Sequence, residues 1–367
     1  SFRGLPIERA GASFALQGEN LDIDFLSARL PNHGDVGLEG RIGNIYGQRE
    51  IAMDFYGGHV ELSLLQNLLP QADMSGVADF RGTLRGSVDN PQVDLDFSAT
   101  RGALFKQPYD SVSFNAAGSL DGVAIKDFSM EKDGKQTWYV DGVVGLTGAK
   151  RIDLRADTVG VRMEDLAALV APDQPITGNV DNTIHFTGTL DNPQAVGYIH
   201  FYLGSYMGVL LSGMDGDYYL QDGKVRLQDF HIYSPMVDMD VNGTVDRAGR
   251  LDLLAEVHDI DMKRIQHKLP YEVSGHGTFS GRIGGSISAP VFHGMLDAPL
   301  VVLNGQEIHQ VHGMVDYQNH RISLSNFGFS QGESGYCGLE LSYGTDNQTV
   351  SGNALVQISQ SCGSFPK

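Results

Sequence analysis

GSVDNPQ at residues 86–92 and GTLDNPQ at residues 188–194 are near copies of one phrase, and they lie 102 residues apart. The equivalent stretch nearer the end of the chain is GSISAP at residues 285–290, a further 97 residues along. Proline donates no backbone hydrogen bond and pushes the residue before it to extended geometry, so the phrase suits the end of one strand and the start of the next. Its recurrence predicts a recurring β-architecture.

A second phrase recurs with the same spacing. An alternating apolar run ends in Asp-Phe or Asn-Phe at Phe128, Phe230 and Phe327, and Leu26 occupies the equivalent place in LDIDFLSA. Because two independent phrases share one step, the chain is predicted to contain four units of about 100 residues, of which the first and last are incomplete. The predicted repeats, within one continuous elongated domain, are 1–75, 76–177, 178–274 and 275–367.

Within a unit the apolar residues have a period of two, which is typical of strands with one apolar and one polar face. Val93, Leu95 and Phe97 alternate with Asp94 and Asp96, for example. The exception is a phrase that closes three units, VELSLLQNLLP, VRMEDLAALVAP and IDMKRIQHKLP. Its apolar spacing fits a short helix that ends before proline. A unit is therefore predicted to have about six strands and one short helix.

Composition argues against several classes of protein. The formal charge is −19 and no basic stripe is visible, so nucleic acid is not an expected partner. No run of roughly eighteen apolar residues occurs, so no transmembrane span is predicted within the segment. The chain starts without Met or a signal peptide, and any targeting segment is expected to lie outside it. Cys337 and Cys362 could pair in an oxidising compartment, which the sequence leaves open.

Motifs for catalysis or nucleotide binding are not found, so neither an enzyme activity nor a cofactor is expected. DMDVNG at residues 238–243 resembles the start of a calcium loop, but Gly249 stands where that loop requires a bidentate Glu. His309 and His312 are three residues apart, which on a strand places them on opposite faces. No metal site is therefore expected.

The Gly-Ser/Thr-aliphatic-Asp-Asn-Pro-Gln phrase, the Asp/Asn-Phe phrase and the short helix, in fixed order and spacing, resemble the TamB branch of the AsmA-like proteins. The resemblance covers essentially all 367 residues as repeated units. It departs in the last unit, where Ala289 replaces Asn and Cys337 stands at an apolar position. The fold that it implies is all-β: an elongated, open, curled sheet of tandem units (a β-taco) with an apolar groove along it.

The function that the resemblance implies is lipid transport. Members of the family span the space between the two membranes of diderm bacteria and are implicated in moving phospholipid to the outer membrane. The implied location is the periplasm, with an inner-membrane anchor in a missing N-terminal helix. A TamA-like outer-membrane barrel protein is the implied partner of parts outside this segment. The candidate lining for acyl chains is the set Val93, Leu95, Phe97, Val123, Ile125, Phe128, Ile152, Leu154, Ile184, Phe186, Val225, Leu227, Phe230, Val237, Met239, Val241, Leu251, Leu253, Ile322 and Leu324.

Alternatives to a lipid groove stay open on the residues alone. In a closed solenoid or sandwich the same apolar residues would pack against an opposite wall, and periodicity does not separate the two arrangements. The chain could be an adhesive or structural repeat protein, although the single Trp138 has no repeat partner. It could also be a scaffold for outer-membrane protein assembly that offers a strand edge to a client. Which alternate residue set faces inward is likewise open.

Overall fold

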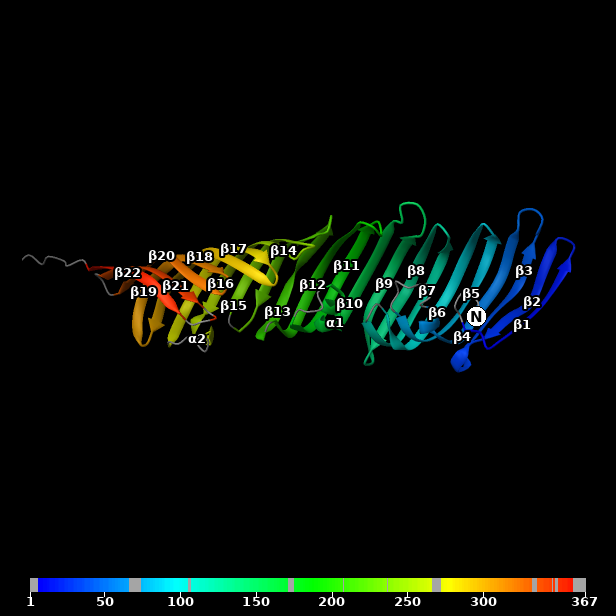
Figure 1. The fold of residues 1–367 in the computed structure, drawn as a ribbon, viewed down its shortest axis with the longest axis horizontal. Helices are drawn as coiled ribbons and strands as arrows, with labels where there is room; N and C mark the ends of the chain where they lie inside the picture. Colours follow the sequence, from blue (N-terminus) through cyan, green and yellow to red (C-terminus); the bar gives the residue numbers. More distant parts are fainter. Residues whose placement is uncertain are drawn as a thin grey trace, which may run out of the picture. The chain divides into compact units, whose positions relative to one another are not determined.

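The computed structural model describes residues 6–65, 74–104, 107–170, 175–206, 208–235, 237–265, 272–331, 335–344, 346 and 349–358. Its strands belong to one antiparallel sheet of 22 strands, and the sheet is open. This confirms the all-β, open-sheet fold predicted from the sequence. The chain divides into two compact units, unit 1 with residues 1–197 and unit 2 with residues 198–367. Figure 1 shows neighbouring strands of each unit side by side in the order of the sequence.

Unit 1 is made of long strands with three short helical segments between them. The elements are β1 (Arg9–Gln17), β2 (Asn20–Arg29), η1 (Pro31–His33), β3 (Asp35–Gly43), β4 (Glu50–Glu61), η2 (Leu62–Leu65), β5 (Met74–Ser87), β6 (Asn90–Leu104), β7 (Gln107–Ser119), β8 (Gly122–Lys132), β9 (Lys135–Gly145), β10 (Ile152–Arg162), α1 (Met163–Val170) and β11 (Ile176–Gly188). The division between the units falls within the next strand, β12 (Pro193–Tyr206).

Unit 2 continues with the same kinds of element. They are β13 (Val209–Gln221), β14 (Lys224–Tyr233), β15 (Val237–Asp246), β16 (Leu251–Asp261), α2 (Met262–Ile265), β17 (Val273–Ser286), β18 (Ala289–Leu303), β19 (Gln306–Gln318), β20 (Arg321–Gln331), β21 (Gly335–Gly344) and β22 (Val350–Ile358).

The strands form a meander. From β1 to β11 each strand of unit 1 pairs antiparallel with its neighbours in the sequence. The same holds in unit 2 from β13 to β22. Antiparallel neighbours need only short turns between them, which is why turn phrases punctuate the sequence.

Six strands and a short helix recur along the chain. The six strands β5–β10 are followed by α1, the six strands β11–β16 are followed by α2, and β17–β22 are six more. The helical segment of the first closing phrase, η2, follows β4 and is a 3-10 turn. The predicted short helices thus occur where the closing phrase predicts them, although Pro70, Pro172 and Pro270, which end that phrase, lie outside the described residues.

The Asp/Asn-Phe phrase marks a β-bulge. The register shifts between Ile125 and Phe128 in the pairing of β8 with β9, and equivalent shifts precede Phe230, Phe327 and Leu26. The residue before each Phe has a positive φ, namely 53° at Asp127, 51° at Asp229 and 49° at Asn326. Asp and Asn tolerate this left-handed conformation better than most residues. The bulge explains why the apolar alternation changes phase at this phrase.

The Asp-Asn-Pro phrase lies in a hairpin. Ser87 pairs with Asn90, so GSVDNP joins β5 to β6 through a tight turn. The glycine at its start has a positive φ in all three copies, 93° at Gly86, 90° at Gly188 and 76° at Gly285. Glycine adopts this conformation without steric cost, so the phrase recurs because the backbone of this turn recurs.

The buried clusters also follow the repeat. In unit 1, Leu62 of η2 is buried in one cluster with Ala99 of β6. In unit 2, Met262 of α2 is buried in one cluster with Ala298 of β18. Ala298 lies 199 residues after Ala99, which is one 102-residue step plus one 97-residue step of the repeat. The short helical segments η2 and α2 therefore cover equivalent positions of the apolar face in the two units.

Candidate apolar binding face

The candidate residues of unit 1 lie in three rows that cross the strands. Residues directly opposite one another on neighbouring strands share one face of the sheet, so the register defines each row. The first row is Val93, Gly118, Val123, Val144 and Ile152. The second row is Leu95, Ala116, Ile125, Gly142, Leu154 and Phe186. The third row contains Phe97, Phe114, Phe128, Val140, Ala156 and Ile184.

Aromatic side chains occupy three successive positions of the third row, Phe97, Phe114 and Phe128. The rings of Phe97 and Phe114 are stacked with centroids 4.7 Å apart, and those of Phe114 and Phe128 are stacked with centroids 6.1 Å apart. Phe80 is opposite Phe97 on β5 and extends the row by one strand. Stacking of this kind adds to the stability that area burial provides. The row is therefore a ridge of rings across β5–β8.

Unit 2 repeats the arrangement with its own candidates. Val225, Val245 and Leu251 are opposite one another across β14–β16. A longer row contains Leu227, Gly243, Leu253, Ile283, Phe292, Tyr317 and Ile322. A parallel row contains Phe230, Val241, Ala255, Gly281, Gly294, Val315 and Leu324. The two remaining candidates, Val237 and Met239, are opposite Ile260 and Val257.

Burial separates this apolar face from the other face of the sheet. Five candidates are buried, Ile152, Ile184, Phe230, Val241 and Leu253, and the others are half-buried. On β6 the intervening side chains of Asp94, Asp96 and Ser98 are exposed. Among the described residues no second sheet exists that could cover the apolar face. The candidates thus form a lipophilic surface, covered in part by the short helices.

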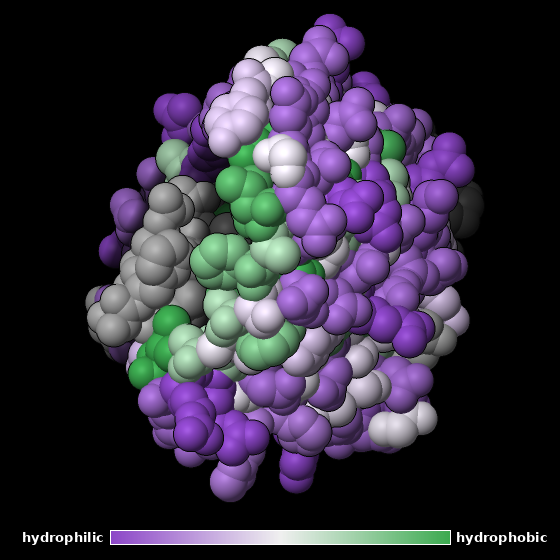
Figure 2. Space-filling model, turned by 90° about the vertical axis from the view of Figure 1, so that its right-hand side faces the viewer, coloured by the Kyte–Doolittle hydropathy of each residue, from purple (hydrophilic) through white to green (hydrophobic). Residues whose placement is uncertain are grey.

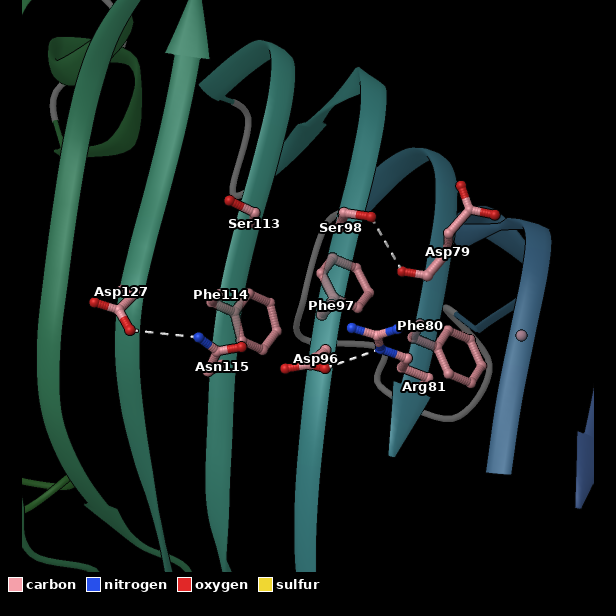
Figure 3. Close-up of a pocket in the computed structure, with 11 residues that line it drawn as sticks. Asp79, Phe80, Arg81, Asp96, Phe97, Ser98, Ser113, Phe114, Asn115 and Asp127 are labelled. Carbon is pink, nitrogen blue, oxygen red and sulfur yellow. Dashed lines mark hydrogen bonds and ion pairs between the residues drawn. The ribbon is translucent and has the colours of Figure 1, made fainter. Parts of the chain in front are cut away.

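A hollow lies across strands β4–β8. It has a volume of about 500 Å³, and its polar lining comes from Asp79, Arg81, Asp96, Ser98, Ser113, Asn115 and Asp127 (Figure 3). Four of these side chains pair with one another. The guanidinium of Arg81 pairs with the carboxylate of Asp96 at 3.0 Å, and the Asn115 amide donates to Asp127 at 3.4 Å. Phe80, Phe97 and Phe114 of the aromatic ridge also line the hollow, and Phe97 is the one among them that belongs to the candidate set. The hollow thus combines polar side chains with the rings of one row, and no nucleophile paired with a base is found among its lining residues.

Histidine–aspartate pairs connect the polar face of unit 2. Asp240 on β15 bridges two neighbours, since one oxygen is 2.8 Å from Nδ1 of His231 and the other is 2.7 Å from Nε2 of His258. His276 on β17 lies 2.7 Å from Asp259 on β16. The hydrogen bond to Asp240 raises the pKa of His258, and that to Asp259 raises the pKa of His276. Asp240, which the sequence places in DMDVNG, is therefore a partner of two imidazoles across the strands.

Strands β14–β17 are expected to lose stability as the pH rises above the ordinary histidine pKa of 6.5. Folding raises the pKa values of His258 and His276. The stability that the two protonated imidazoles contribute to the fold is therefore complete below their pKa in the unfolded chain, and it disappears as the pH rises through their pKa in the folded protein. Both groups are exposed, so the effect is small. Hydrogen exchange of these strands, corrected for the intrinsic rate, should show faster opening at about pH 8 than at about pH 6. The double variant His258→Gln, His276→Gln should lose this difference, and a difference that persists would contradict the assignment.

In the described ranges no helix is long and apolar enough to cross a bilayer. Within those same ranges, no group of three or more His, Cys, Asp or Glu side chains is arranged to hold a metal ion. Cys337 lies on β21 opposite Phe329 and Val356, whereas Cys362 lies outside the described residues, so their pairing stays an open question.

Comparison with protein-family models, with curated proteins and with solved structures finds no match to this chain. The resemblance to the TamB branch of the AsmA-like proteins, and the location and partners that it implies, therefore stay predictions. The four repeat boundaries stay predictions as well, and the division into two compact units at residue 197 falls within the third predicted repeat.

Several members of the rows were not selected from the sequence. Phe80 and Phe114 belong to the aromatic ridge, and Val140 and Val144 continue two rows onto β9. The signal for each was present, because all four stand at alternate positions within apolar strands. No local sequence pattern indicates the histidine–aspartate pairs, because the two members of each pair lie on different strands. Only the register between those strands brings them together.

Proposed function

We propose that this chain is a non-enzymatic segment of a periplasmic, TamB-like protein that binds the acyl chains of phospholipid along its apolar face. The lipid would pass between the inner and outer membranes of a diderm bacterium. The anchor in the inner membrane and the contact with a TamA-like outer-membrane protein would belong to parts outside this segment. The observation that carries the proposal is the set of apolar rows, which within each unit cross several strands without a charged side chain.

The energetics favour an acyl chain as the guest. Exposing hydrocarbon to water costs about 0.8 kcal/mol per methylene, so a sixteen-carbon chain costs roughly 12 kcal/mol. A surface of Val, Ile, Leu and Phe side chains removes part of that cost without any specific polar contact. Because successive strands offer similar side chains, neighbouring positions on a row have similar affinity and a chain can move between them. The head group would stay in water at the lip of the sheet.

Photo-crosslinking tests the proposal. A photoreactive residue at Leu95 or Ile125 lies in the second row, and one at Asp94 or Lys126 lies at the exposed neighbouring position. After irradiation in cell envelopes, phosphate-containing lipid adducts are expected at the first two positions only. Equal labelling at all four, or no lipid adduct at Leu95 and Ile125, would refute acyl-chain binding on this face.

A further inference from the structure

We propose that one edge of unit 1 docks on the surface of a zwitterionic phospholipid bilayer. This turn edge consists of the turns at residues 44–49, 88–89, 120–121, 146–151 and 189–192, which join β3 to β4, β5 to β6, β7 to β8, β9 to β10 and β11 to β12. Apolar side chains of these turns would insert between the lipids. The purpose of docking, to bring acyl chains to the apolar rows, rests on the proposed function, whereas the docking step itself needs no bound lipid.

The turn edge presents large apolar side chains to water. Hairpin turns are usually built from Gly, Asn, Asp, Ser and Pro, because these residues suit the backbone of a turn. Four turns of this edge instead have an exposed large residue, and the fifth has the half-buried Val88. The exposed residues are Tyr46, Leu120, Leu146 and Leu190, which are 77%, 53%, 45% and 51% exposed. Single exposed apolar residues are common, but their recurrence on successive turns of one edge indicates a binding surface.

The opposite edge of unit 1 has a different character. The two-residue turn between β8 and β9 is Asp133–Gly134, and the helical segments η1, η2 and α1 follow strands that end at this edge. Leu30, between β2 and β3, is only 3% exposed. Figure 1 shows the turn edge above the strands of unit 1 and the helical segments below them. Among the described residues of unit 1, the turns with an exposed apolar residue therefore lie on one edge.

The backbone of the turn edge is suited to an apolar phase. The N–H of Val88 donates to the carbonyl of Arg49 at 2.9 Å, and the N–H of Leu190 donates to the carbonyl of Lys150 at 3.0 Å. In both cases the acceptor belongs to the preceding turn of the same edge. An unpaired N–H is costly in hydrocarbon. The apolar residues of these turns can therefore leave water without losing a hydrogen bond of their N–H groups.

The spacing of the turns favours lipid over a protein partner. Successive turns of one edge are two strands apart, which is about 10 Å at the usual strand spacing, so the five turns extend over roughly 40 Å. Asp89, Asp121 and Asp191 each directly follow an apolar residue of these turns and interrupt the apolar surface. A protein interface has a continuous, well-packed core, whereas the fluid boundary of a bilayer can surround separate side chains.

Charge favours a zwitterionic bilayer over an anionic one. The five turns contain equal numbers of carboxylates and cationic groups, which are Asp89, Asp121, Asp191, Arg49, Lys150 and Arg151. The guanidinium of Arg49 pairs with the carboxylate of Asp89 at 3.3 Å. The whole chain, by contrast, has a formal charge of −19, which an anionic surface would repel. A surface without net charge admits the neutral turn edge and does not repel the remainder of the chain.

The turn edge borders the uncovered part of the apolar face. In the first row, Val144 is two residues before Leu146, and Val123 is three residues after Leu120. The buried cluster around Leu62 of η2 contains no member of the first or second row. Figure 2 views unit 1 from the end where β1 lies and shows a hydrophobic band between hydrophilic surfaces. An acyl chain that leaves a bilayer at the turn edge thus reaches the first row without passing the helical segments.

Sedimentation with vesicles measures the docking. The whole purified protein is mixed with phosphatidylcholine vesicles, and bound protein is measured as a function of lipid concentration. We expect saturable binding that changes less than about twofold when the salt is raised to about 0.5 M, because insertion of apolar side chains is not screened. The double variant Leu146→Ser, Leu190→Ser should bind at least about tenfold more weakly, because two leucines no longer leave water.

Two similarly exposed valines within strands provide the matched control. Val143 on β9 and Val196 on β12 are 49% and 53% exposed. The variant Val143→Ser, Val196→Ser should bind vesicles as the parent protein does, and thermal unfolding checks that both double variants are folded. Absence of binding to phosphatidylcholine, equal losses in the two variants, or binding to anionic vesicles only would overturn the proposal. Self-association that the leucine variant abolishes, without binding to vesicles, would assign the edge to a second copy and would likewise overturn it.

Docking and the proposed function can fail separately. Lipid phosphorus per mole of purified protein reports on the apolar rows, and vesicle sedimentation reports on the turn edge. Protein that carries lipid but does not bind vesicles would contradict docking alone. Protein that binds vesicles through Leu146 and Leu190 but carries no lipid would contradict the proposed function and support the docking surface.

Discussion

Arginine at both Leu95 and Leu154 is expected to lower the amount of co-purifying phospholipid by about tenfold or more. The two residues belong to the second row of unit 1, on β6 and β10, and both are half-buried on the apolar face. If each guanidinium removes one methylene of the guest from apolar contact, the loss is about 1.6 kcal/mol of binding free energy, which exceeds a factor of ten. The measurement is lipid phosphorus per mole of purified protein.

The matched control adds the same charge to the opposite face. Ser98→Arg lies on β6 at an exposed position and should retain the lipid content of the parent protein. Thermal unfolding of each variant separates loss of lipid from loss of fold, because a folded double variant without lipid supports the apolar row as the binding surface. Unchanged lipid in a folded Leu95→Arg, Leu154→Arg variant would contradict the proposed function.

The repeat could be predicted because its phrases encode backbone geometry rather than contacts. Gly86 requires a positive φ in a hairpin, and Asp127 requires one in a bulge, so the residue types recur wherever the backbone does. The alternation of Val93, Leu95 and Phe97 likewise follows from the two-residue period of a strand. These signals are local, and each can be seen within about ten residues of sequence.

Pairings across strands could not be predicted to the same depth. Asp240 is the partner of His231 and His258 only because the bulge in β14 and the turn into β16 set the register. A shift of one residue would place Asp240 on the apolar face, so the pairs depend on information distributed over three strands. The same reasoning explains why Phe114 was missed: its importance comes from Phe97 and Phe128 on the adjoining strands.

The glycines within the rows connect the fold to the proposed binding face. Gly142 separates Ile125 from Leu154 in the second row, and it lies on β9 with a φ of 142°. Gly40 and Gly243 have φ values of 136° and 139° at equivalent places in other repeats. Glycine at this point lets neighbouring strands approach closely and leaves a shallow interval between larger side chains. The apolar rows are therefore uneven, with larger side chains separated by half-buried glycine backbone.

Gly142→Ala is expected to reduce the free energy of unfolding of unit 1 by about 3–5 kcal/mol, a loss typical of severe backbone strain. An added Cβ would overlap the carbonyl oxygen of Asp153 and crowd Cα of Leu154, which are backbone atoms of the paired strand and cannot rotate away.

The control is Gly134→Ala, whose φ of 71° is also positive but whose Cβ would meet nothing within 4 Å, so it should cost only about 1–2 kcal/mol. Urea unfolding followed by the fluorescence of Trp138, the single tryptophan, which lies on the same strand β9, reports on this unit directly. Equal losses for the two variants would show that conformation alone, and not the close approach of β9 to β10, determines the need for glycine at this position.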